Sequence, residues 1–424
     1  MRCAAPSRRS VSLLTPRPYQ LEGRDFLAKT RIGLLADEMR VGKTGQAILA
    51  AAKQGAKKII VLSGPAIAAP MWRFQFPRWW MAEQPNAQMM PRVESVSMTK
   101  ALLMREEILS QTWDLAIVDE CHFAGNPEAQ RTKMIWGKGG LAWKSGQIWA
   151  LSGTPAPKHA GSLWPMLFAA GVVKVDYLTF IRHYCRIDWM SQRPVGTKEE
   201  HIPELRALWQ QIGLRRTRKQ VAPEMPDIGF DFLQVDPDKK VDLANPGFMS
   251  DDALLASMEQ RAAIDREDRI AVATAKLGPL LEEVEFSLAN SLLKQTVIFG
   301  WHLDPLKKAT SVLKAMGFKA EMIYGETSEA KRIEIQKKFA LGLIDVVVGQ
   351  IRACGTAIDL SAASHGYFLE LDWVPGNNLQ AANRLIAIGK NEKVTIDVAT
   401  MPGSIDDKIQ GVLLRRVREL AKLF

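Results

Sequence analysis

The stretch that most constrains the fold is residues 34–48, where an apolar run passes through a glycine turn into a helical pattern. A turn is expected at Gly42, and Lys43-Thr44 begin the helix. In a phosphate-binding loop of this layout, backbone N–H groups and the positive end of the helix face an anion, the lysine reaches the outer phosphates and the hydroxyl can bind Mg²⁺. The strict pattern has glycine where this chain has Asp37, so the loop alone is only suggestive. The predicted nucleotide-binding residues of this loop are Arg40, Val41, Gly42, Lys43, Thr44 and Gly45.

Short runs rich in Val, Ile and Leu alternate with helical stretches in two parts of the chain. Buried parallel strands have this continuous apolar character, and the alternation indicates sheets covered by helices on both faces. The predicted strands are residues 32–36, 58–62, 115–118 and 148–151 in the first part, and 296–300, 320–324, 345–349, 366–371 and 394–398 in the second. We therefore predict an α/β fold with two tandem lobes.

Changes in residue composition along the sequence divide the chain further. Residues 1–160 are predicted to form the first lobe. Aromatic and basic residues dominate residues 161–226, which we interpret as a mostly helical insertion on that lobe. Residues 227–285 begin with many Asp, Pro and Lys and continue with helical spacing, so they are predicted to be a linker and helical region. Residues 286–424 are predicted to form the second lobe.

Composition limits the kind of protein. The formal net charge of +10 and the pI near 9.4 favour a polyanionic partner. The four cysteines are scattered, which argues against a disulfide framework or a zinc module. His183 and Cys185 could ligate a metal, but no second ligand pair lies nearby in sequence, so no metal site is predicted there. Without an apolar run of about 18–20 residues or a secretory leader, we expect a soluble intracellular protein with no membrane partner.

A second chemical feature is the pair Asp119-Glu120 at the end of an apolar run. Ligands bind at the carboxyl ends of strands in open α/β sheets. Asp119 would hold Mg²⁺, usually through water, and Glu120 would polarise an attacking water. A strand that ends in a solvated acidic turn is the ordinary alternative. The occurrence of this pair after a phosphate-loop pattern favours a nucleotide site.

Ser152-Gly153-Thr154-Pro155 follows another predicted strand. Hydroxyls at this position can sense the γ-phosphate through the loop that contains His122. Alone, the four residues indicate only a turn.

These motifs, in this order, resemble those of superfamily-two helicases, and more narrowly those of Swi/Snf-type double-stranded DNA translocases. The resemblance extends over about residues 15–400 and is nearest in texture to the compact annealing helicases and their phage or bacterial relatives. The segments that carry it are Arg17–Gly23, Asp37–Thr44 with its DEM-x-x-GKT pattern, Gly64-Pro65 followed by Trp72, Asp119-Glu120-x-His122 (a DEAH-like box), Ser152–Pro155, Leu214–Val221 followed by Met225-Pro226, Gly355–Gly376 and Gln380–Lys390.

The resemblance implies two RecA-like lobes that bind ATP and Mg²⁺ between them. Gln20 is expected to recognise adenine, and Thr44 and Asp119 are expected to hold the metal. The catalytic residues implied are Lys43, Asp119, Glu120 and Arg384. The residues implied to couple the nucleotide site to movement are His122, Ser152, Thr154 and Gln380. The DNA-binding residues implied are Thr99, Lys100, Arg215, Arg216, Arg218 and Trp373.

Two departures from the family pattern affect the prediction. Position 40 is Arg where the family usually has Gly, and position 387 is Ala where its motif has a second arginine. That arginine normally reaches the γ-phosphate, and loss of such a finger can cost about 10³-fold or more in rate. Lys390 and Arg352 are the nearby cations that could substitute.

The favoured function is an ATP-dependent double-stranded DNA translocase that remodels branched DNA or displaces bound protein in DNA repair or replication. One alternative is a nucleotide-dependent DNA-binding module whose hydrolysis is impaired by Ala387. A second is an RNA helicase, which the Swi/Snf-type segments 215–221 and 355–376 disfavour. The expected location is the cytoplasm of a bacterial or phage-infected cell, and the choice of protein partner stays open.

Overall fold

The structure is a computed structural model that describes residues 14–64, 68–189, 191–236, 263–355, 358–387, 389–404, 406, 409–411 and 422–423. The chain forms two compact units. The first comprises Met1–Ile187, Gly196–Ala222 and Glu419–Phe424, and the second comprises Asp188–Val195 and Pro223–Arg418. Among the described residues, none of the helices is both long and apolar enough to cross a membrane.

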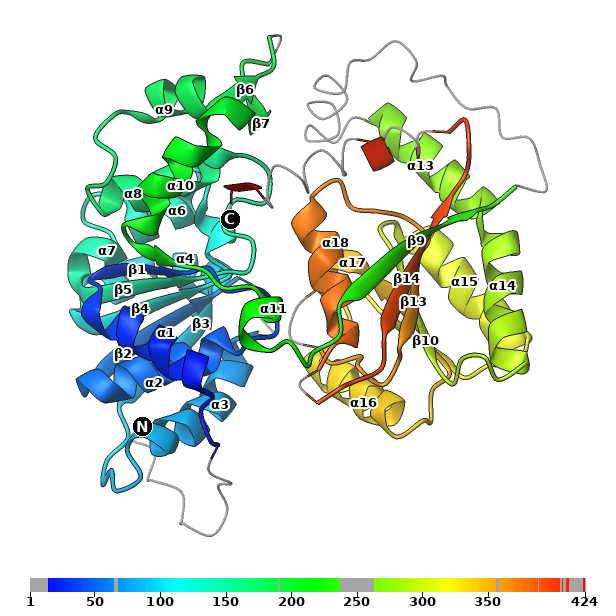
Figure 1. Cartoon of the computed structure of the whole chain (residues 1–424), viewed down its shortest axis with the longest axis horizontal. Coiled ribbons are helices and arrows are strands. Elements are labelled where there is room, and N and C mark those ends of the chain that lie inside the picture. The colour runs from blue at the N-terminus through cyan, green and yellow to red at the C-terminus, as the bar shows by residue number, and fades with distance from the viewer. Residues whose placement is uncertain are drawn as a thin grey trace. The chain divides into compact units, whose positions relative to one another are not determined.

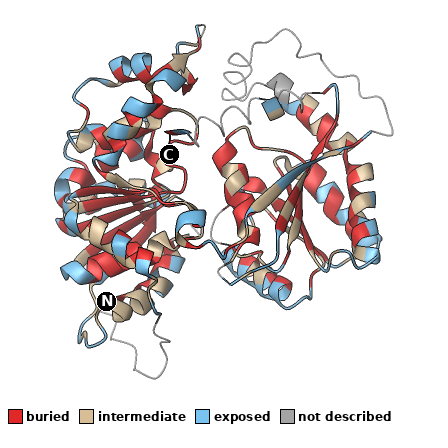
Figure 2. Cartoon of the chain, viewed as in Figure 1, coloured by how far each residue is buried: buried red, intermediate tan, exposed pale blue. Residues whose placement is uncertain are grey.

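The first unit is built on a six-stranded parallel sheet with the strand order β3-β2-β4-β5-β1-β8 (Figure 1). The strands are β1 (Ile32–Leu35), β2 (Lys58–Ser63), β3 (Arg92–Ser97), β4 (Trp113–Asp119), β5 (Ser145–Leu151) and β8 (Gly213–Leu214). The central strands are buried over most of their length, as Figure 2 shows for this sheet. This burial explains their uninterrupted apolar sequences.

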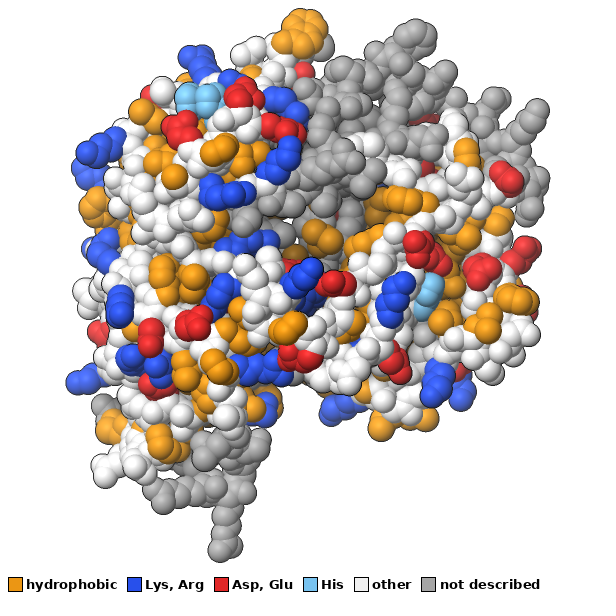
Figure 3. Space-filling model, in the orientation of Figure 1, with side chains coloured by type: hydrophobic (Ala, Val, Ile, Leu, Met, Phe, Trp, Pro, Cys, Tyr) orange, Lys and Arg blue, Asp and Glu red, His pale blue; other side chains and the backbone are white. Residues whose placement is uncertain are grey.

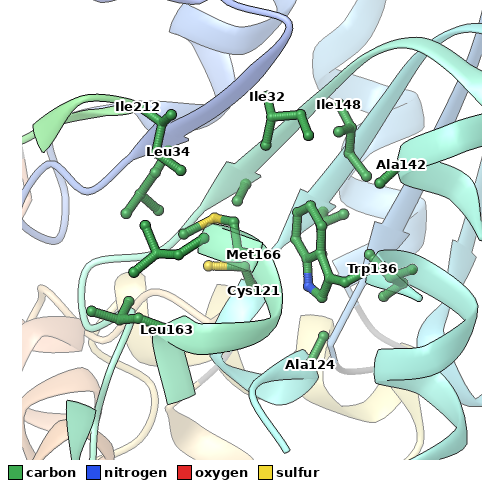
Figure 4. Packing of buried hydrophobic residues seen from close by; sticks show 14 of the residues in the cluster. Ile32, Leu34, Cys121, Ala124, Trp136, Ala142, Ile148, Leu163, Met166 and Ile212 are labelled. Atoms are coloured by element: carbon green, nitrogen blue, oxygen red, sulfur yellow. The ribbon is translucent and has the colours of Figure 1, made fainter. Parts of the chain in front are cut away.

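Successive residues of these strands face two different cores. In β2, Ile60 and Leu62 pack into one core while Ile59 and Val61 pack into the other. This period of two is the geometry of an extended strand. Figure 4 shows the first core, where Ile32 and Leu34 of β1 lie with Trp136 and Met166 from the helices that cover this face.

The helices of the first unit divide between the two faces. The face with Ile59 and Val61 is covered by α1 (Pro18–Lys29), α2 (Lys43–Gln54) and α3 (Ala68–Glu83). The opposite face is covered in part by short helices that follow β3 and β4. These are α4 (Met98–Leu103), α5 (Arg105–Leu109), η1 (Cys121–Ala124), α6 (Gln130–Trp136) and α7 (Leu141–Lys144).

Most of the predicted helical insertion packs in the first unit, which contains residues 161–187 and 196–222, whereas residues 188–195 and 223–226 belong to the second. Its elements are η2 (Ala160–Leu163), α8 (Trp164–Ala169), α9 (Tyr177–Tyr184), β6 (Cys185–Ile187), β7 (Pro194–Thr197), η3 (Glu199–His201), α10 (Ile202–Gln210) and α11 (Arg218–Val221). The insertion then returns to the sheet, because β8 pairs in parallel with β1. Leu423 near the end of the chain is buried in the same core, and its carbonyl accepts a hydrogen bond of 3.1 Å from the Trp209 indole.

The second unit has its own six-stranded parallel sheet, in the order β11-β12-β10-β13-β14-β9. The strands are β9 (Ile228–Gln234), β10 (Thr296–Gly300), β11 (Ala320–Ile323), β12 (Val346–Gln350), β13 (His365–Phe368) and β14 (Val394–Thr400). The helices are α13 (Ala263–Ala275), α14 (Leu277–Ala289), α15 (Leu303–Ala315), α16 (Glu329–Ala340), α17 (Ile351–Cys354), α18 (Pro375–Ala382) and η5 (Asn383–Leu385). The prediction of two parallel-sheet lobes is confirmed.

The structure differs from the prediction over residues 227–285. We predicted a linker and helical region, whereas β9 forms the edge of the second sheet beside β14. Leu277, Leu280 and Val284 of α14 are buried in the core of the same unit. Most of β9 is only partly buried or exposed, so its sequence lacks the apolar run that marked the central strands. Residues 237–262 of the predicted linker lie outside the described residues.

Candidate functional site

The phosphate-loop pattern lies between β1 and α2, at the carboxyl end of the first sheet. Arg40 and Gly42 have positive φ angles of 68° and 78°. Glycine adopts this left-handed conformation at little cost. A Cβ atom at Gly42 would also lie 2.5 Å from Nε2 of Gln20, so the turn requires glycine on two grounds. α2 starts directly after this turn, and its first amide groups therefore face the space around the loop.

Lys43 lies across the loop. Its ammonium donates hydrogen bonds to the carbonyls of Asp37 (2.8 Å) and Glu38 (3.0 Å). Burial lowers the pKa of Lys43, and the nearby carboxylates of Glu120, Asp37 and Asp119 oppose that effect. A lysine in this position can exchange its carbonyl partners for phosphate oxygens.

Asp37, the residue that departs from the strict glycine pattern, is the buried anchor of the loop. Its carboxylate accepts hydrogen bonds from the Arg216 guanidinium at 2.6 and 3.1 Å and from the Arg216 backbone amide at 2.9 Å. Arg216 also donates to Oε1 of Gln46 at 2.8 Å, and Gln46 donates to Asp37 at 3.2 Å. The loop is therefore fixed by a buried ion pair whose partners are far apart in sequence.

The other two predicted arginines of this segment also face the loop. Arg218 forms an ion pair of 3.1 Å with Glu38, and its backbone amide donates to the same carboxylate at 2.7 Å. Arg215 donates to the carbonyls of Ala36 (2.8 Å) and Gly153 (3.2 Å). The basic segment thus lies beside the phosphate loop.

This placement corrects part of the predicted DNA-binding set. Arg216 and Arg218 are 9% and 7% exposed, so their guanidinium groups hold the loop and do not form a basic surface. Arg215 is likewise directed at backbone carbonyls of the site. The prediction counted the charges of the segment, and the carboxylates that pair with them lie about 180 residues earlier.

The acidic pair Asp119-Glu120 begins at the same register of the sheet as the end of β1, where the phosphate loop starts. Asp119 of β4 and Leu35 of β1 both align with Leu151 of the intervening strand β5. Oδ2 of Asp119 accepts a hydrogen bond of 2.8 Å from the indole of Trp72, and Oδ1 accepts one of 3.1 Å from the Glu120 amide. Burial first, and the charge of Glu120 second, raise the pKa of Asp119 to about 6. The motif that includes Trp72 gave no indication of this hydrogen bond to Asp119.

The predicted coupling residues of the first unit converge beside Glu120. Nδ1 of His122 lies 3.1 Å from Oγ of Ser152, and Oγ of Ser152 lies 3.4 Å from Oε2 of Glu120. The Thr154 amide donates to Oγ of Ser152 at 3.1 Å. Oγ1 of Thr154 is buried without a hydrogen-bond partner in the described part of the chain. A Cβ at Gly153 would lie 3.5 Å from Nζ of Lys43, so this turn packs directly against the phosphate loop.

The remaining predicted nucleotide-site residues lie around the same loop. Gln20, in the first turn of α1, accepts a hydrogen bond of 2.9 Å from the Arg17 amide and approaches Gly42. Val41 is fully buried, and Thr44 is the second residue of α2. Gly45 lies under Trp79, since a Cβ there would be 2.6 Å from the indole ring. The adenine-binding role of Gln20 stays a prediction.

Two predicted DNA-binding residues are at the surface of the first unit. Thr99 and Lys100 are exposed in the first turn of α4, which begins directly after β3. The Ser97 side chain caps this helix by accepting a hydrogen bond of 3.2 Å from the Lys100 amide. Their contact with DNA stays a prediction.

In the second unit, two cations near position 387, Arg384 and Lys390, have hydrogen-bond partners within that unit. The Arg384 guanidinium donates to the Gly355 carbonyl. The Lys390 ammonium donates to the carbonyls of Ser361 (2.8 Å), Ala363 (2.6 Å) and Leu385 (3.1 Å). Gln380 packs against Gly355, where a Cβ would lie 3.6 Å from its side chain.

Trp373 belongs to an aromatic and cationic cluster that sequence analysis largely missed. Its ring centroid lies 4.5 Å from that of Trp301. The Arg352 guanidinium lies 4.4 Å from the Trp301 ring centroid, and Arg352 also pairs with Asp372 at 3.4 Å. Arg269 of α13 lies 5.4 Å from the Trp373 ring centroid. The signal available in the sequence was a tryptophan after each of two neighbouring strands, at positions 301 and 373.

The donor set of the first unit fits a nucleoside triphosphate and a magnesium ion. The turn at Gly42 has no side chain above the start of α2, and Lys43 reaches its centre. A hydroxyl at Thr44 and carboxylates at Asp119 and Glu120 are the oxygen ligands that Mg²⁺ prefers. Residues that follow β1, β4, β5 and β8 thus lie around the N-terminus of α2, where an anion can bind.

Comparisons with known proteins agree with this arrangement. The family model of the SNF2-related domain matches residues 19–244, and that of the helicase conserved C-terminal domain matches residues 276–389. The human protein named DNA annealing helicase and endonuclease ZRANB3 is 26% identical over 447 residues, which covers 97% of this chain and 40% of that protein. A Xenopus tropicalis protein named SWI/SNF-related matrix-associated actin-dependent regulator of chromatin subfamily A-like protein 1 is 26% identical over 427 residues, covering 96% and 44%.

The chain therefore spans less than half the length of these two relatives. Among solved structures, the Sulfolobus solfataricus SWI2/SNF2 ATPase core in complex with dsDNA shares 19% sequence identity with it. That comparison covers 97% of this chain and 99% of the archaeal one, with a TM-score of 0.40.

Proposed function

The chain belongs to the SNF2-related family, whose model covers more than half of its 424 residues, and we propose that it is an ATP-driven motor acting on double-stranded DNA. The resemblance predicted from the motifs is confirmed by this match. The observation that carries the proposal is the assembly of Lys43, Asp119, Glu120 and Ser152 at one edge of the first sheet, since a site for phosphoryl transfer needs these groups together.

The residues of this site divide the chemistry among them. Lys43 would leave the loop carbonyls and bind the outer phosphates, while the first amides of α2 hold the phosphate oxygens. Thr44 and Asp119 would hold Mg²⁺. When bound, the ion neutralises negative charge on the phosphate oxygens. Glu120 would orient the attacking water and accept its proton. Ser152 and His122 fix the Glu120 carboxylate in position.

We propose duplex and branched DNA as the polymer on which the motor acts. Support comes from family membership and from the name of the human relative, an annealing helicase. The contacts proposed on this chain are the exposed Thr99 and Lys100, and Trp373 in the second unit. Such a motor grips phosphates, so its DNA affinity should depend little on sequence and fall as salt rises.

A second candidate function has a specific observation in its favour. Ala387 stands where the family motif has an arginine, and the nearby Lys390 already donates to three carbonyls. Arg352, the other potential substitute, is paired with Asp372 and lies against Trp301. The chain would then bind nucleotide and DNA but turn over slowly, and would act as a nucleotide-dependent DNA-binding module.

The test is steady-state ATP hydrolysis measured with no nucleic acid, duplex DNA, single-stranded DNA, forked DNA and RNA. Glu120→Gln is the matched control, because it keeps the side-chain shape and removes the base. Stimulation by duplex or forked DNA in the wild type but not in Glu120→Gln supports the motor. Tight duplex binding with negligible turnover supports the binding module. Selective stimulation by RNA would overturn both and support an RNA helicase.

A further inference from the structure

Three side chains on the insertion of the first unit converge away from the nucleotide site. His183 is in the last turn of α9, His201 ends η3 and Glu204 is in the first turn of α10. Nε2 of His183 lies 3.0 Å from Oε2 of Glu204, and Nδ1 of His201 lies 3.7 Å from the same oxygen. The proposed motor chemistry uses none of the three.

The spacing of these atoms is that of a metal-ligand set. The three potential ligand atoms all lie within 4.8 Å of one another. A tetrahedral zinc ion with bonds of about 2.0–2.2 Å holds its nitrogen and oxygen ligands roughly 3.2–3.6 Å apart. The two separations that involve Glu204, 3.0 and 3.7 Å, lie just outside this interval on either side, and the two imidazole nitrogens lie within 4.8 Å of each other. The side chains would therefore have to move closer together to bind one ion.

Neighbouring side chains hold the Glu204 carboxylate in an orientation that suits metal binding. The Tyr184 hydroxyl donates a hydrogen bond of 2.6 Å to Oε1 of Glu204, and the other oxygen faces the imidazoles. The hydrogen bonds from Tyr184 and His183 lower the pKa of Glu204, so it is ionised at neutral pH. Partners that orient a ligating carboxylate in this way are a regular part of metal sites.

The backbone of the insertion brings the three residues together. His201 and Glu204 are three positions apart at the start of a helix, so their side chains share one face. The Lys198 amide donates to the Tyr184 carbonyl at 2.9 Å, which places the segment before η3 beside the end of α9. The partners of His183 are about 20 residues further along the chain, which is why the local sequence search did not find them.

We propose that His183, His201 and Glu204 form a binding site for a divalent transition metal ion, zinc foremost, that links α9 to α10. Two imidazoles and one carboxylate suit zinc, and three protein ligands leave a fourth position for water. The site is accessible, because His183 and Glu204 are about half exposed, at 47% and 54% of their side-chain surface. Figure 3 shows histidine side chains next to acidic ones on the surface of the first unit, in the region where Figure 1 labels α9.

The experiment is calorimetric titration of ZnCl₂ into the full chain after removal of metals with a chelator. We expect one zinc equivalent per chain, and more than a tenfold loss of affinity in His183→Ala and in Glu204→Gln. Tyr184→Phe removes only the supporting hydrogen bond, and a loss of about 10-fold is expected for it. His365→Ala is the control, since His365 pairs with Asp397 in the second unit and should leave zinc affinity unchanged.

A second readout separates metal binding from a folding defect. Zinc should raise the melting temperature of the wild type and of His365→Ala, and leave that of Glu204→Gln unchanged, because only binding to the native state shifts the equilibrium. Circular dichroism checks that each variant is folded. The proposal is overturned if the wild type shows no saturable zinc binding, or if Glu204→Gln and His183→Ala bind zinc as tightly as the wild type.

Discussion

Asp119 shows how the fold tunes a single residue of the proposed nucleotide site. Burial and the charge of Glu120 raise its pKa to about 6, while the Trp72 indole donates a hydrogen bond that favours the ionised form. A carboxylate that is to hold a magnesium ion must be ionised. Mg²⁺ must displace this proton, so the affinity of the nucleotide-free site for Mg²⁺ should fall as the pH is lowered through about 6.

The same shift predicts a pH-dependent difference in stability between the wild type and Asp119→Asn. The folded-state pKa of Asp119 is above its usual value of 3.8, so its stabilising contribution is complete below that value and is lost as the pH rises through about 6. The loss amounts to at most about 3 kcal/mol. Asn keeps an acceptor for Trp72 and does not ionise.

Thermal unfolding of the two proteins between pH 4 and pH 8 measures this difference. Asp119→Asn should gain in melting temperature relative to the wild type as the pH rises, with most of the gain between about pH 4 and pH 6. A constant difference across this range would mean that the pKa of Asp119 is not raised.

Arg216 gives a second prediction at the scale of single residues. Arg216→Ala removes the partner of the buried Asp37 carboxylate and should destabilise the first unit by about 3–5 kcal/mol. The exposed neighbour Lys219 is the matched control, and Lys219→Ala should change stability by less than about 0.5 kcal/mol. Urea unfolding followed by tryptophan fluorescence measures both. An Arg216→Ala protein of normal stability that binds DNA poorly would return Arg216 to the DNA-binding set.

At the scale of elements, the buried central strands were the predictable part of the fold. The prediction for residues 296–300 coincides with β10, because all five of its residues are buried and apolar or small. Residues 230–235 of the predicted linker are strand-like in sequence, but an edge strand with exposed residues gives no sign that it joins a sheet. The same distinction holds in the site. Local motifs predicted Lys43 and Asp119, whereas Trp72 and Arg216 act through partners that only the fold brings near.

The packing of α2 against α3 gives a prediction about an element. A side chain at Gly45 would collide with the Trp79 indole, which lies 2.6 Å from the Cβ position. Gly45→Leu should shift the start of α2 and weaken nucleotide binding about 10-fold or more, since overpacking costs about 1–3 kcal/mol. Titration with a fluorescent ATP analogue measures the effect.

Two companion variants make this test specific. Adding Trp79→Ala to Gly45→Leu removes the collision and should restore part of the affinity. Gly411→Leu is the control, because a Cβ atom at Gly411 meets no atom of the described residues within 4 Å. Normal nucleotide affinity in Gly45→Leu alone would show that the helix start tolerates movement.

At the scale of the whole molecule, the residue at position 387 bears on the proposed rate of ATP turnover. If the missing arginine limits hydrolysis, Ala387→Arg should raise duplex-stimulated ATP turnover, by as much as about 10³-fold. Ala387→Lys is the companion variant, because lysine supplies charge without the forked geometry of a guanidinium and should give a smaller gain. No gain from Ala387→Arg would mean that the chain does not lack this function.

The most direct test of the central claim is displacement of a third strand from a triplex formed on duplex DNA. A motor that moves along the duplex should release that strand only when ATP is hydrolysed. We predict ATP-dependent release by the wild type, faster release by Ala387→Arg, and none by Lys43→Ala or Glu120→Gln. ATP hydrolysis by the wild type and Ala387→Arg on the same duplex, with the third strand left in place, would contradict the proposed translocation.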